Sequence, residues 1–316
     1  MAHFGFNTTG DEIVEAFQDQ VKDRTFLITG CSVDGIGAET AYSLAKASPR
    51  LLILAGRNIS SLQPVIDRVE ASGVKTVFLQ LDLSSQASIK SAAQSVQDLD
   101  VQVDVLINNA GIMACPYALS VDNVETQFAT NAVGPALFTY LLLKANLIKH
   151  RIVSVSSSAS VRNAEYVLAA LDDLTYGNGT TYSPIAAYST SKAALNLFTS
   201  ELSAKVKSHG ISVFALNPGS IKSPLQRYIT EEMRQAAFAA AKKENADFVP
   251  PVRKSLQEGC ATQLRAALDP SLEARSGSYL DDCQVANYQL LEDAKPAASR
   301  VWGLLEQMTG TTFELD

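Results

Sequence analysis

The feature that most restricts the fold is an alternation of short apolar runs with longer helical segments from residue 24 onward. The runs are rich in Val, Ile and Leu and continuously apolar, which is typical of parallel strands buried on both faces. They predict strands at residues 25–29, 51–55, 76–81, 103–108, 151–156, 211–217 and 277–280. Helices are predicted at residues 38–48, 60–72, 84–99, 121–147, 183–208, 257–268 and 293–308. The pattern predicts an α/β fold, a doubly wound parallel sheet in three layers, with ligands at the carboxyl ends of the strands.

The regular alternation stops after residue 217. Residues 220–255 are polar and Ala-rich and include Pro250-Pro251, which indicates a helical excursion over a ligand site rather than a second domain. Residues 1–23 precede the first strand as an N-terminal extension. An acidic helix at residues 11–20, packed on the surface, is predicted there, with partial disorder as the alternative. We therefore expect one domain over residues 24–316, with insertions near residues 159–187 and 225–252.

Composition excludes several classes of partner. A net charge of −7 and a pI near 5.1 disfavour nucleic acid and anionic membranes, which attract basic surfaces. The chain has no run of about eighteen apolar residues that could span a bilayer, and its polar, acidic first 20 residues differ from a secretory signal. The cysteines lack metal-ligand spacing, so we expect reduced thiols, no metal site and a cytoplasmic location; they are Cys31, Cys115, Cys260 and Cys283.

A glycine-rich loop follows the first predicted strand. Gly30, Gly35 and Gly37 lead directly into the first predicted helix. Glycines let the backbone approach a pyrophosphate closely, and the N-terminus of the helix offers free N–H groups and a positive dipole. We expect this loop to bind a dinucleotide, with Ser32 and Ile36 among the contacts; an ordinary glycine turn is the alternative.

Arg57 follows the second predicted strand, twenty residues after Gly37. An acidic residue near this place would bind the ribose hydroxyls of NAD, whereas a guanidinium suits the 2′-phosphate of NADP. We therefore expect NADP(H) as cofactor, with NAD less favoured. Asp34 is a mild signal against this choice, because its negative charge lies near the expected phosphate, and a solvated surface arginine is the alternative for Arg57.

Two further strand ends offer contacts for a nucleotide. Asp82 and Leu83 follow the third predicted strand and are expected to hold the adenine, although the carboxylate could instead cap the next helix. Asn109, Ala110 and Gly111 follow the fourth, where a small residue and a glycine let the backbone lie close to the adenosine ribose. A plain turn is the alternative for these three residues.

Tyr188 and Lys192 lie four residues apart in the predicted helix 183–208. Side chains at this spacing share one helix face, so the ammonium of Lys192 can stand close to the phenol of Tyr188. A free tyrosine has a pKa near ~10, and a neighbouring positive charge favours the phenolate. The pair could therefore protonate a carbonyl oxygen or deprotonate an alcohol, although chance also places such pairs on solvated helices.

Taken in order, these motifs resemble the short-chain dehydrogenase/reductase family, from residue 25 to about residue 225. The order comprises the glycine loop, Asn108-Asn109-Ala110-Gly111, Asn131, Ser157, Tyr188-x-x-x-Lys192 and Pro218-Gly219. The stretch from Gly111 to Tyr117 and the long gap between Ser157 and Tyr188 are similar to the retinol-dehydrogenase-like branch, which includes many fungal members. The resemblance implies a Rossmann-like fold and often a homodimer, although the retinol-like branch also includes monomers.

The resemblance also implies roles for particular residues. Tyr188 would be the general acid or base, Ser157 would steady the substrate oxygen, and Lys192 would bind the nicotinamide ribose and lower the pKa of Tyr188. Asn131 would anchor a water that links Lys192 to solvent, and an alternative for Asn131 is a polar residue that helps to bend a long helix. The nicotinamide would meet a last group of residues, namely Pro218, Gly219, Ile221 and Ser223.

The sequence departs from the family pattern at the glycine loop and in the insertions. Four residues separate Gly30 from Gly35 where the family usually has three, which leaves the loop geometry open. Ser154 and Ser223 replace the commoner asparagine and threonine. The polar segment 159–187 is expected to shape one wall of the substrate pocket and residues 225–252 the other. Their aromatic and aliphatic side chains suggest a lipophilic ligand, although they could equally pack the insert onto the core.

Three functions compete at this stage. The first is an NADP(H)-dependent oxidoreductase that interconverts a carbonyl and an alcohol on a lipophilic small molecule. By analogy with fungal relatives, that molecule would be an intermediate of secondary metabolism. The second retains the fold but reduces an activated C=C or C=N bond, or supports an epimerisation. The third is a nucleotide-binding scaffold without turnover, which the presence of the full Asn131, Ser157, Tyr188 and Lys192 set disfavours.

Overall fold

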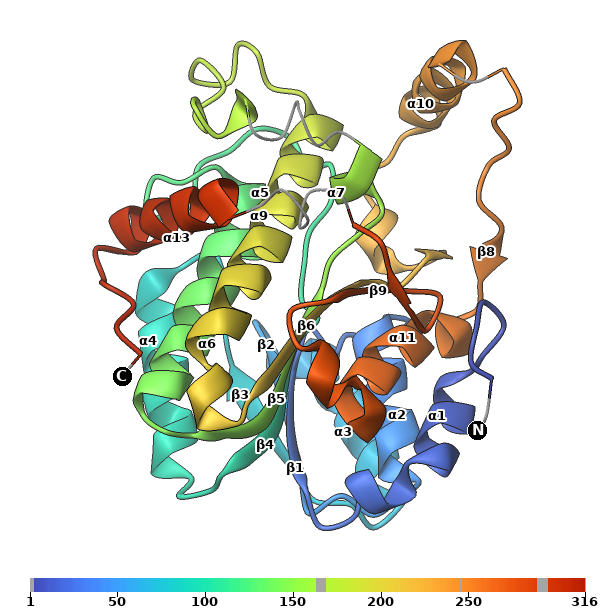
Figure 1. The fold of residues 1–316 in the computed structure, drawn as a ribbon, viewed down its shortest axis with the longest axis vertical. Coiled ribbons are helices and arrows are strands. Elements are labelled where there is room, and N and C mark those ends of the chain that lie inside the picture. The colour runs from blue at the N-terminus through green and yellow to red at the C-terminus, as the bar shows by residue number, and fades with distance from the viewer. Residues whose placement is uncertain (1–2, 163–168, 245, 289–294, 316) are drawn as a thin grey trace.

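The structure is a computed structural model that describes residues 3–162, 169–244, 246–288 and 295–315. A mostly parallel sheet lies between two helical layers (Figure 1). Its strand order is β10-β9-β6-β5-β4-β1-β2-β3, and only β10 runs antiparallel. The order reverses between β1 and β4, which creates a crevice at the carboxyl ends of these strands. The predicted doubly wound, three-layered α/β fold is confirmed.

The strands follow the apolar runs closely. The eight strands of this sheet are β1 (Thr25–Thr29), β2 (Leu51–Gly56), β3 (Thr76–Gln80), β4 (Val103–Asn108), β5 (Ile148–Val155), β6 (Ser212–Asn217), β9 (Tyr279–Asp281) and β10 (Gln284–Ala286). The short strand β10 was missing from the prediction. So was a separate two-stranded pairing, β7 (Ser220–Ile221) with β8 (Arg253–Lys254). Two or three residues give no periodic signal in a sequence.

Helices cover both faces of the sheet (Figure 1). One layer holds α4 (Gln86–Asp98), α5 (Thr126–Phe128), α6 (Gly134–Lys144), α9 (Pro184–Lys205) and α13 (Lys295–Thr309). The other holds α1 (Gly10–Ala16), α2 (Ile36–Ala45), α3 (Ile59–Glu70) and α11 (Leu256–Leu268). Two helices lie above the carboxyl edge, α7 (Ala159–Arg162) and α10 (Glu231–Glu244), and α10 projects away from the body. Short 3-10 turns span Gln18–Gln20, Lys207–His209, Pro224–Gln226 and Pro270–Arg275.

The predicted helix 121–147 was too long at both ends. Helical structure begins at Thr126, because Leu119 and Glu125 form an antiparallel bridge around a turn at Asn123, whose φ is +61°. It ends at Lys144, and the left-handed Asn146 turns the chain into β5. The predicted helix 11–20 is likewise shorter, since α1 ends at Ala16 and a 3-10 turn follows.

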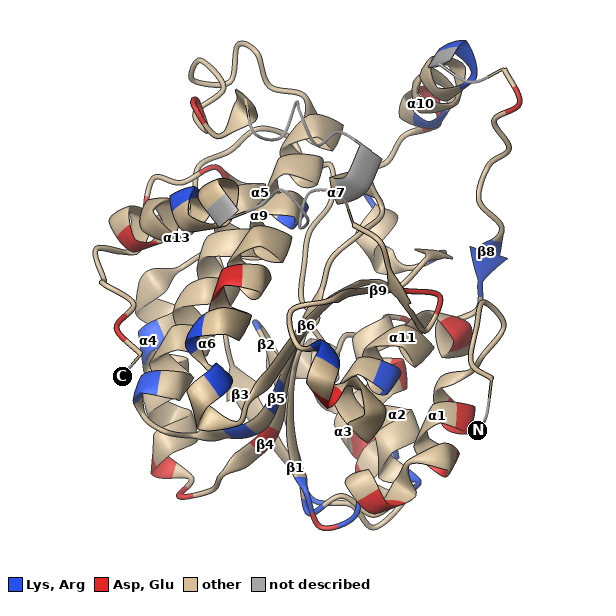
Figure 2. Cartoon of the chain, in the orientation of Figure 1, with Lys and Arg blue, Asp and Glu red and all other residues tan. Residues whose placement is uncertain are grey.

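The apolar residues form a core on each side of the sheet. Along β1, Phe26 and Ile28 face α1, α2, α3 and α11, while Leu27 faces α4, α6 and α9. All three side chains are fully buried. Figure 2 shows that charged residues lie mainly on the outer helices and loops, whereas the central strands carry few. Burial of both faces leaves the edge at the strand ends as the place for a polar site.

The C-terminal helix packs on the layer that contains α6 and α9. Trp302 of α13 stacks on Phe198 of α9, with ring centroids 5.5 Å apart. Phe313, which follows α13, stacks on Tyr140 of α6 at 4.7 Å. Aromatic pairs at these separations add to the free energy gained from burial. The C-terminal residues therefore stabilise the positions of α6 and α9.

Arg151 is a charged residue inside this core. Its guanidinium donates hydrogen bonds to the carbonyl oxygens of Ala266 (2.8 Å) and Asp269 (2.7 Å), which lie at the C-terminal end of α11. A cation at this end of a helix also interacts favourably with the helix dipole. Burial lowers the pKa of Arg151, while Glu273, 3.6 Å from the guanidinium, opposes that shift.

We expect Arg151→Met to lower the free energy of unfolding by about 2–4 kcal/mol, because it removes a buried cation and its hydrogen bonds to two carbonyl groups. The Asp269 oxygen then keeps only the N–H of Leu272 as a donor. Urea titration followed by circular dichroism would measure the change. An exposed arginine that lies just before β2, Arg50, provides the control, and Arg50→Met should cost less than about 0.5 kcal/mol. Equal losses in both variants would contradict the stabilising role of Arg151.

Candidate active site

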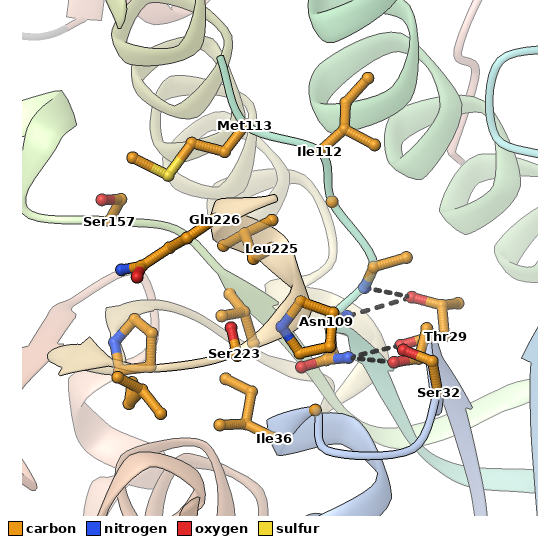
Figure 3. A pocket seen from close by; sticks show the side chains of 18 of the residues that line it. Thr29, Ser32, Ile36, Asn109, Ile112, Met113, Ser157, Ser223, Leu225 and Gln226 are labelled. Carbon is orange, nitrogen blue, oxygen red and sulfur yellow. Dashed lines mark hydrogen bonds between the residues drawn. The ribbon is translucent and has the colours of Figure 1, made fainter. Parts of the chain in front are cut away.

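A cavity of about 840 Å³ opens at the carboxyl edge of the sheet. This volume is sufficient for a large organic ligand. Figure 3 shows Thr29, Ser32 and Ile36 at one end, and Met113, Ser157 and Gln226 toward the other. Every residue predicted from the sequence to bind a cofactor or act in catalysis lines this cavity, except Gly37 and Asn131. The cavity therefore brings together segments that are far apart in the chain.

The glycine loop has the backbone shape that a close approach requires. Gly30 has a φ of +74°, and a Cβ atom there would lie 2.6 Å from Cα of Ala110. A Cβ on Gly37 would lie 2.6 Å from the carbonyl oxygen of Gly30, so Gly37 serves packing within the loop. The extra residue of this loop is accommodated by a turn: the N–H of Gly35 donates to the oxygen of Ser32 (3.1 Å), and Asp34 is left-handed at +60°.

Thr29 and Asn109 fasten the ends of β1 and β4 together (Figure 3). The Thr29 hydroxyl accepts hydrogen bonds from the backbone N–H groups of Asn109 and Ala110, both at 3.0 Å. The Asn109 amide donates to the carbonyl oxygens of Thr29 (2.7 Å) and Gly30 (3.0 Å). Sequence reasoning missed Thr29, because a threonine that ends a strand has no distinctive pattern. The other atom of the Asn109 amide, Oδ1, is buried beside the cavity without a partner in the described residues.

The next two strand ends present one charge each to the cavity. Arg57 follows β2 directly and is exposed. The Asp82 carboxylate accepts hydrogen bonds from the N–H (2.9 Å) and the hydroxyl (2.7 Å) of Ser84, which forms a local turn. Asp82 does not cap α4, because Ser85 occupies the N-cap of that helix. The alternative of a helix cap for Asp82 was therefore wrong.

Tyr188 and Ser157 meet inside the cavity. Tyr188 is only 3% exposed, and burial raises its pKa to about 12, although a hydrogen bond with Ser157 acts in the opposite direction. Lys192, which is equally buried, donates a hydrogen bond of 2.7 Å to the carbonyl oxygen of Val155. Burial lowers the pKa of Lys192 to about 8.

The expectation that Lys192 lowers the pKa of Tyr188 stays a prediction, because burial and Ser157 are the causes of the shift in this phenol. The pKa of Tyr188 is raised because the loss of water around the phenol outweighs its hydrogen bond with Ser157. The amine of Lys192 bonds to the end of β5 instead of the phenol. The shared helix face was predicted correctly, but neighbouring side chains on a helix need not interact with each other.

Asn131 lies in a π-helical turn, Ala129–Val133, between α5 and α6. Such turns are rare and often occur at functional sites. The Asn131 amide donates to the carbonyl oxygen of Ile112 and accepts from its N–H, both at 2.9 Å, and also donates to Ser191 (3.0 Å). A Cβ on Gly111 would lie 3.2 Å from Asn131 Oδ1 and 3.3 Å from Lys192 Nζ. Asn131 thus holds the Gly111 segment close to Lys192, and the expected water stays a prediction.

The segment after β6 forms the opposite wall. Asn217 accepts hydrogen bonds from the N–H groups of Ser158 (3.1 Å) and Gly219 (3.2 Å) and donates to Asp281 (2.9 Å). Gly219 has a φ of +93°, which a side chain would disfavour. Four predicted residues of this segment line the cavity, namely Pro218, Gly219, Ile221 and Ser223.

The two predicted insertions contribute unequally to the cavity. From residues 225–252, five line it, namely Leu225, Gln226, Arg227, Pro251 and Val252. From residues 159–187, Ala159 lines it, and residues 163–168 lie outside the described part of the chain. Tyr182, in the insertion at residues 159–187, instead packs against Tyr176 and Tyr117 and donates a hydrogen bond to the buried Glu125 carboxylate (3.0 Å). The predicted pocket wall from residues 159–187 stays a prediction.

Metal-ligating clusters and membrane-spanning helices are both absent from the residues that the structure describes. No group of three His, Cys, Asp or Glu side chains there could hold a metal ion. No helix within the same ranges is both long enough and apolar enough to cross a bilayer. The four cysteines are buried and free, and burial raises the pKa of each thiol.

The low pKa of Lys192 predicts how stability changes with pH. The folded protein loses this proton near pH 8, whereas the unfolded chain holds it until about 10.5. Between these values the unfolded state binds more protons, so stability rises with pH. From pH 7.5 to 9.5 we expect the wild type to gain about 2 kcal/mol in the free energy of unfolding relative to Lys192→Met. Urea titrations at both pH values would measure this, with Lys205→Met on the surface of α9 as control. Parallel pH dependence in wild type and Lys192→Met would contradict it.

Comparison with known proteins places this site in a family. The family model described as short chain dehydrogenase matches residues 24–169 and 177–234. Short-chain dehydrogenase/reductase prx1 from Penicillium roqueforti is 34% identical over 85% of this chain and 76% of its own length. Retinol dehydrogenase 12 from Homo sapiens is 31% identical over 93% of this chain and 89% of its own. A crystal structure of an uncharacterized protein from Mycobacterium Paratuberculosis superposes with a TM-score of 0.69 at 30% identity, covering 93% of this chain and 96% of that one. These matches confirm the predicted resemblance, and the chain belongs to the short-chain dehydrogenase family of oxidoreductases, on its retinol-dehydrogenase-like branch.

Proposed function

We propose that this protein interconverts a carbonyl and an alcohol on a lipophilic small molecule, with NADP(H) as cofactor. The observation that carries this proposal is the meeting of Tyr188, Ser157 and Lys192 in the same cavity as the glycine loop. A proton donor and a dinucleotide cradle at one strand edge are what a carbonyl reduction requires. Retinol dehydrogenase 12 and the Penicillium reductase, both similar over most of this chain, support the same reaction class.

The residues of the glycine loop fit a dinucleotide. The N-terminus of α2 faces the cavity at Gly35 and Ile36, where the positive end of the helix dipole suits a pyrophosphate. The buried, unpartnered Oδ1 of Asn109 offers an acceptor beside it. Arg57 is exposed on the cavity wall, where its guanidinium would suit the 2′-phosphate of NADP. Lys192, Ile221 and Ser223 would hold the nicotinamide half.

Tyr188 would donate and accept the proton in this reaction. With a pKa of about 12, its phenol holds its proton at neutral pH and can donate it to a carbonyl oxygen during reduction. A bound nicotinamide ring supplies or accepts the hydride. Ser157, which hydrogen-bonds Tyr188, can donate to the same oxygen and stabilise the charge that develops there. The reverse reaction needs a more acidic phenol, and the charge of Lys192 would favour the phenolate.

The side chains at the substrate end suggest the class of substrate. Apolar and polar groups mix there, and the apolar ones are Ile112, Met113, Ala159, Leu225, Pro251 and Val252. Such a lining suits a lipophilic molecule, and burial of its apolar surface would supply most of the binding free energy. Gln226 and Arg227 add polar groups that would orient it.

The predicted homodimer remains part of the proposal but is restricted by the fold. Family members often associate through the helices that contain Asn131 and Tyr188, which here are the π-helical turn Ala129–Val133 with α6, and α9. Trp302 and Phe313 already pack against α9 and α6. A dimer would therefore use a different face or include the C-terminal residues in its interface.

We expect Tyr188→Phe to reduce NADPH-dependent turnover of ketones and aldehydes at least about a hundredfold, because it removes the donated proton. Cofactor binding, followed by NADPH fluorescence, should change less than about threefold, since the ring remains. Tyr140→Phe, outside the cavity, is the matched control and should keep full activity. Undiminished turnover in Tyr188→Phe would contradict the proposed role. A product that keeps its carbonyl, seen by mass and absorbance, would point to C=C reduction instead.

We expect Arg57→Ala to weaken NADPH binding about tenfold or more and to leave NADH binding unchanged, because only NADPH carries the 2′-phosphate. Fluorescence titration of both cofactors would give the two dissociation constants. Arg50→Ala changes an exposed arginine at the other end of β2 and should alter neither value. If Arg57→Ala weakens both cofactors equally, the preference for NADP(H) must come from another residue.

A further inference from the structure

The turn between β9 and β10 is unusual in its residues. Asp281 pairs with Gln284, so Asp282 and Cys283 make a two-residue hairpin turn, with φ of +45° and +61°. Turns of this shape strongly favour Asn-Gly, Asp-Gly or Gly-Gly, because most side chains disfavour positive φ, so Cys283 is the unusual residue of this pair. A non-glycine pair persists in it only when the surroundings hold it there. Asp281 and Asp282 also line the cavity, so the strained turn is part of the cleft wall.

Three side chains hold this turn. Lys254 Nζ lies 2.6 Å from Asp282 Oδ1, and the lysine side chain is only 1% exposed. Thr262 accepts a hydrogen bond from the Cys283 N–H (3.1 Å), and Arg265 donates to the Cys283 carbonyl oxygen. A buried ammonium is costly unless it is paired, so the ion pair strongly restricts where Asp282 can lie.

Lys254 also contacts two other segments of the cleft. It lies in β8, opposite Ile221 of β7, and a Cβ on Gly219 would lie 2.8 Å from Lys254 Cδ. Its ammonium sits over the ring of Phe6, 4.7 Å from the ring centre. Phe6, Gly219, Ile221 and Asp282 all line the cavity, although Lys254 itself does not. One buried cation therefore touches the N-terminal segment, the segment after β6 and the β9–β10 turn.

We propose that Lys254 is a positioning residue for the cofactor, and that its ion pair with Asp282 holds three segments of the cleft wall in their binding arrangement. The N-terminal segment, through Phe6, is then part of the cofactor site rather than an appendage. This inference rests on the proposed NADP(H)-dependent function. A cleft wall that is already ordered before binding lowers the entropic cost of binding. Loss of the Lys254–Asp282 ion pair should therefore weaken the affinity for the cofactor.

The test is Lys254→Met in the full chain, which keeps most of the side-chain volume and removes the charge. We expect the dissociation constant for NADPH to rise about tenfold, while kcat at saturating NADPH stays within about threefold of wild type. Arg151→Met is the matched control, because it removes an equally buried cation at the opposite end of the sheet. It should lower the melting temperature without changing the NADPH affinity.

The outcomes separate this inference from the proposed function. If the wild type does not bind NADPH, the proposed function fails. If the wild type binds it, and Lys254→Met binds it within twofold of wild type, the positioning role is overturned. If Lys254→Met does not fold, the variant Phe6→Ala tests the inference instead, because the exposed Phe6 side chain can be truncated without loss of the fold. It should weaken NADPH binding about threefold at unchanged kcat, and unaltered binding would overturn the inference.

Discussion

The burial of both faces of the parallel sheet is the constraint on which the rest of the structure depends. Strands such as β1 and β4 are buried along their whole length, so the faces of the sheet are mainly apolar and hold few charged side chains. They collect where the strands end, and the reversal of strand order leaves that edge open between β1 and β4. Thr29 and Asn109 occupy this opening and join the two strands. The position of the cavity thus follows from the helical layers that cover both faces of the sheet.

Removal of water from this edge also determines its electrostatics. Burial raises the pKa of Tyr188 and lowers that of Lys192, so each group is pushed toward its neutral form. Asn131 and Asn217 are also buried, and each forms hydrogen bonds with several backbone groups, which holds the walls of the cavity together.

Much of this could be predicted from the sequence, because local patterns encode it. Continuous apolar runs identified the strands of the large sheet except β10, and most motifs fell at strand ends. The exceptions are Asn131 and the Tyr188-x-x-x-Lys192 pair, which lie in helical segments. The errors have physical causes. Two- and three-residue strands such as β7 and β10 are too short for periodicity. Asn123 lies before the start and Asn146 after the end of the helical structure, and both have a left-handed backbone that many asparagines do not adopt. The contacts of Lys254 and Phe6 join residues about 250 positions apart, which a single sequence does not reveal.

The aromatic residues near the C-terminus have a practical consequence. Because Trp302 and Phe313 pack on α9 and α6, the last part of the chain supports the helix on which Tyr188 lies. A shortened expression product that stops before Phe313 would expose the rings of Tyr140 and Phe198 to solvent. Such a product would be prone to aggregate, and affinity tags are therefore better joined through a spacer that leaves this aromatic cluster intact.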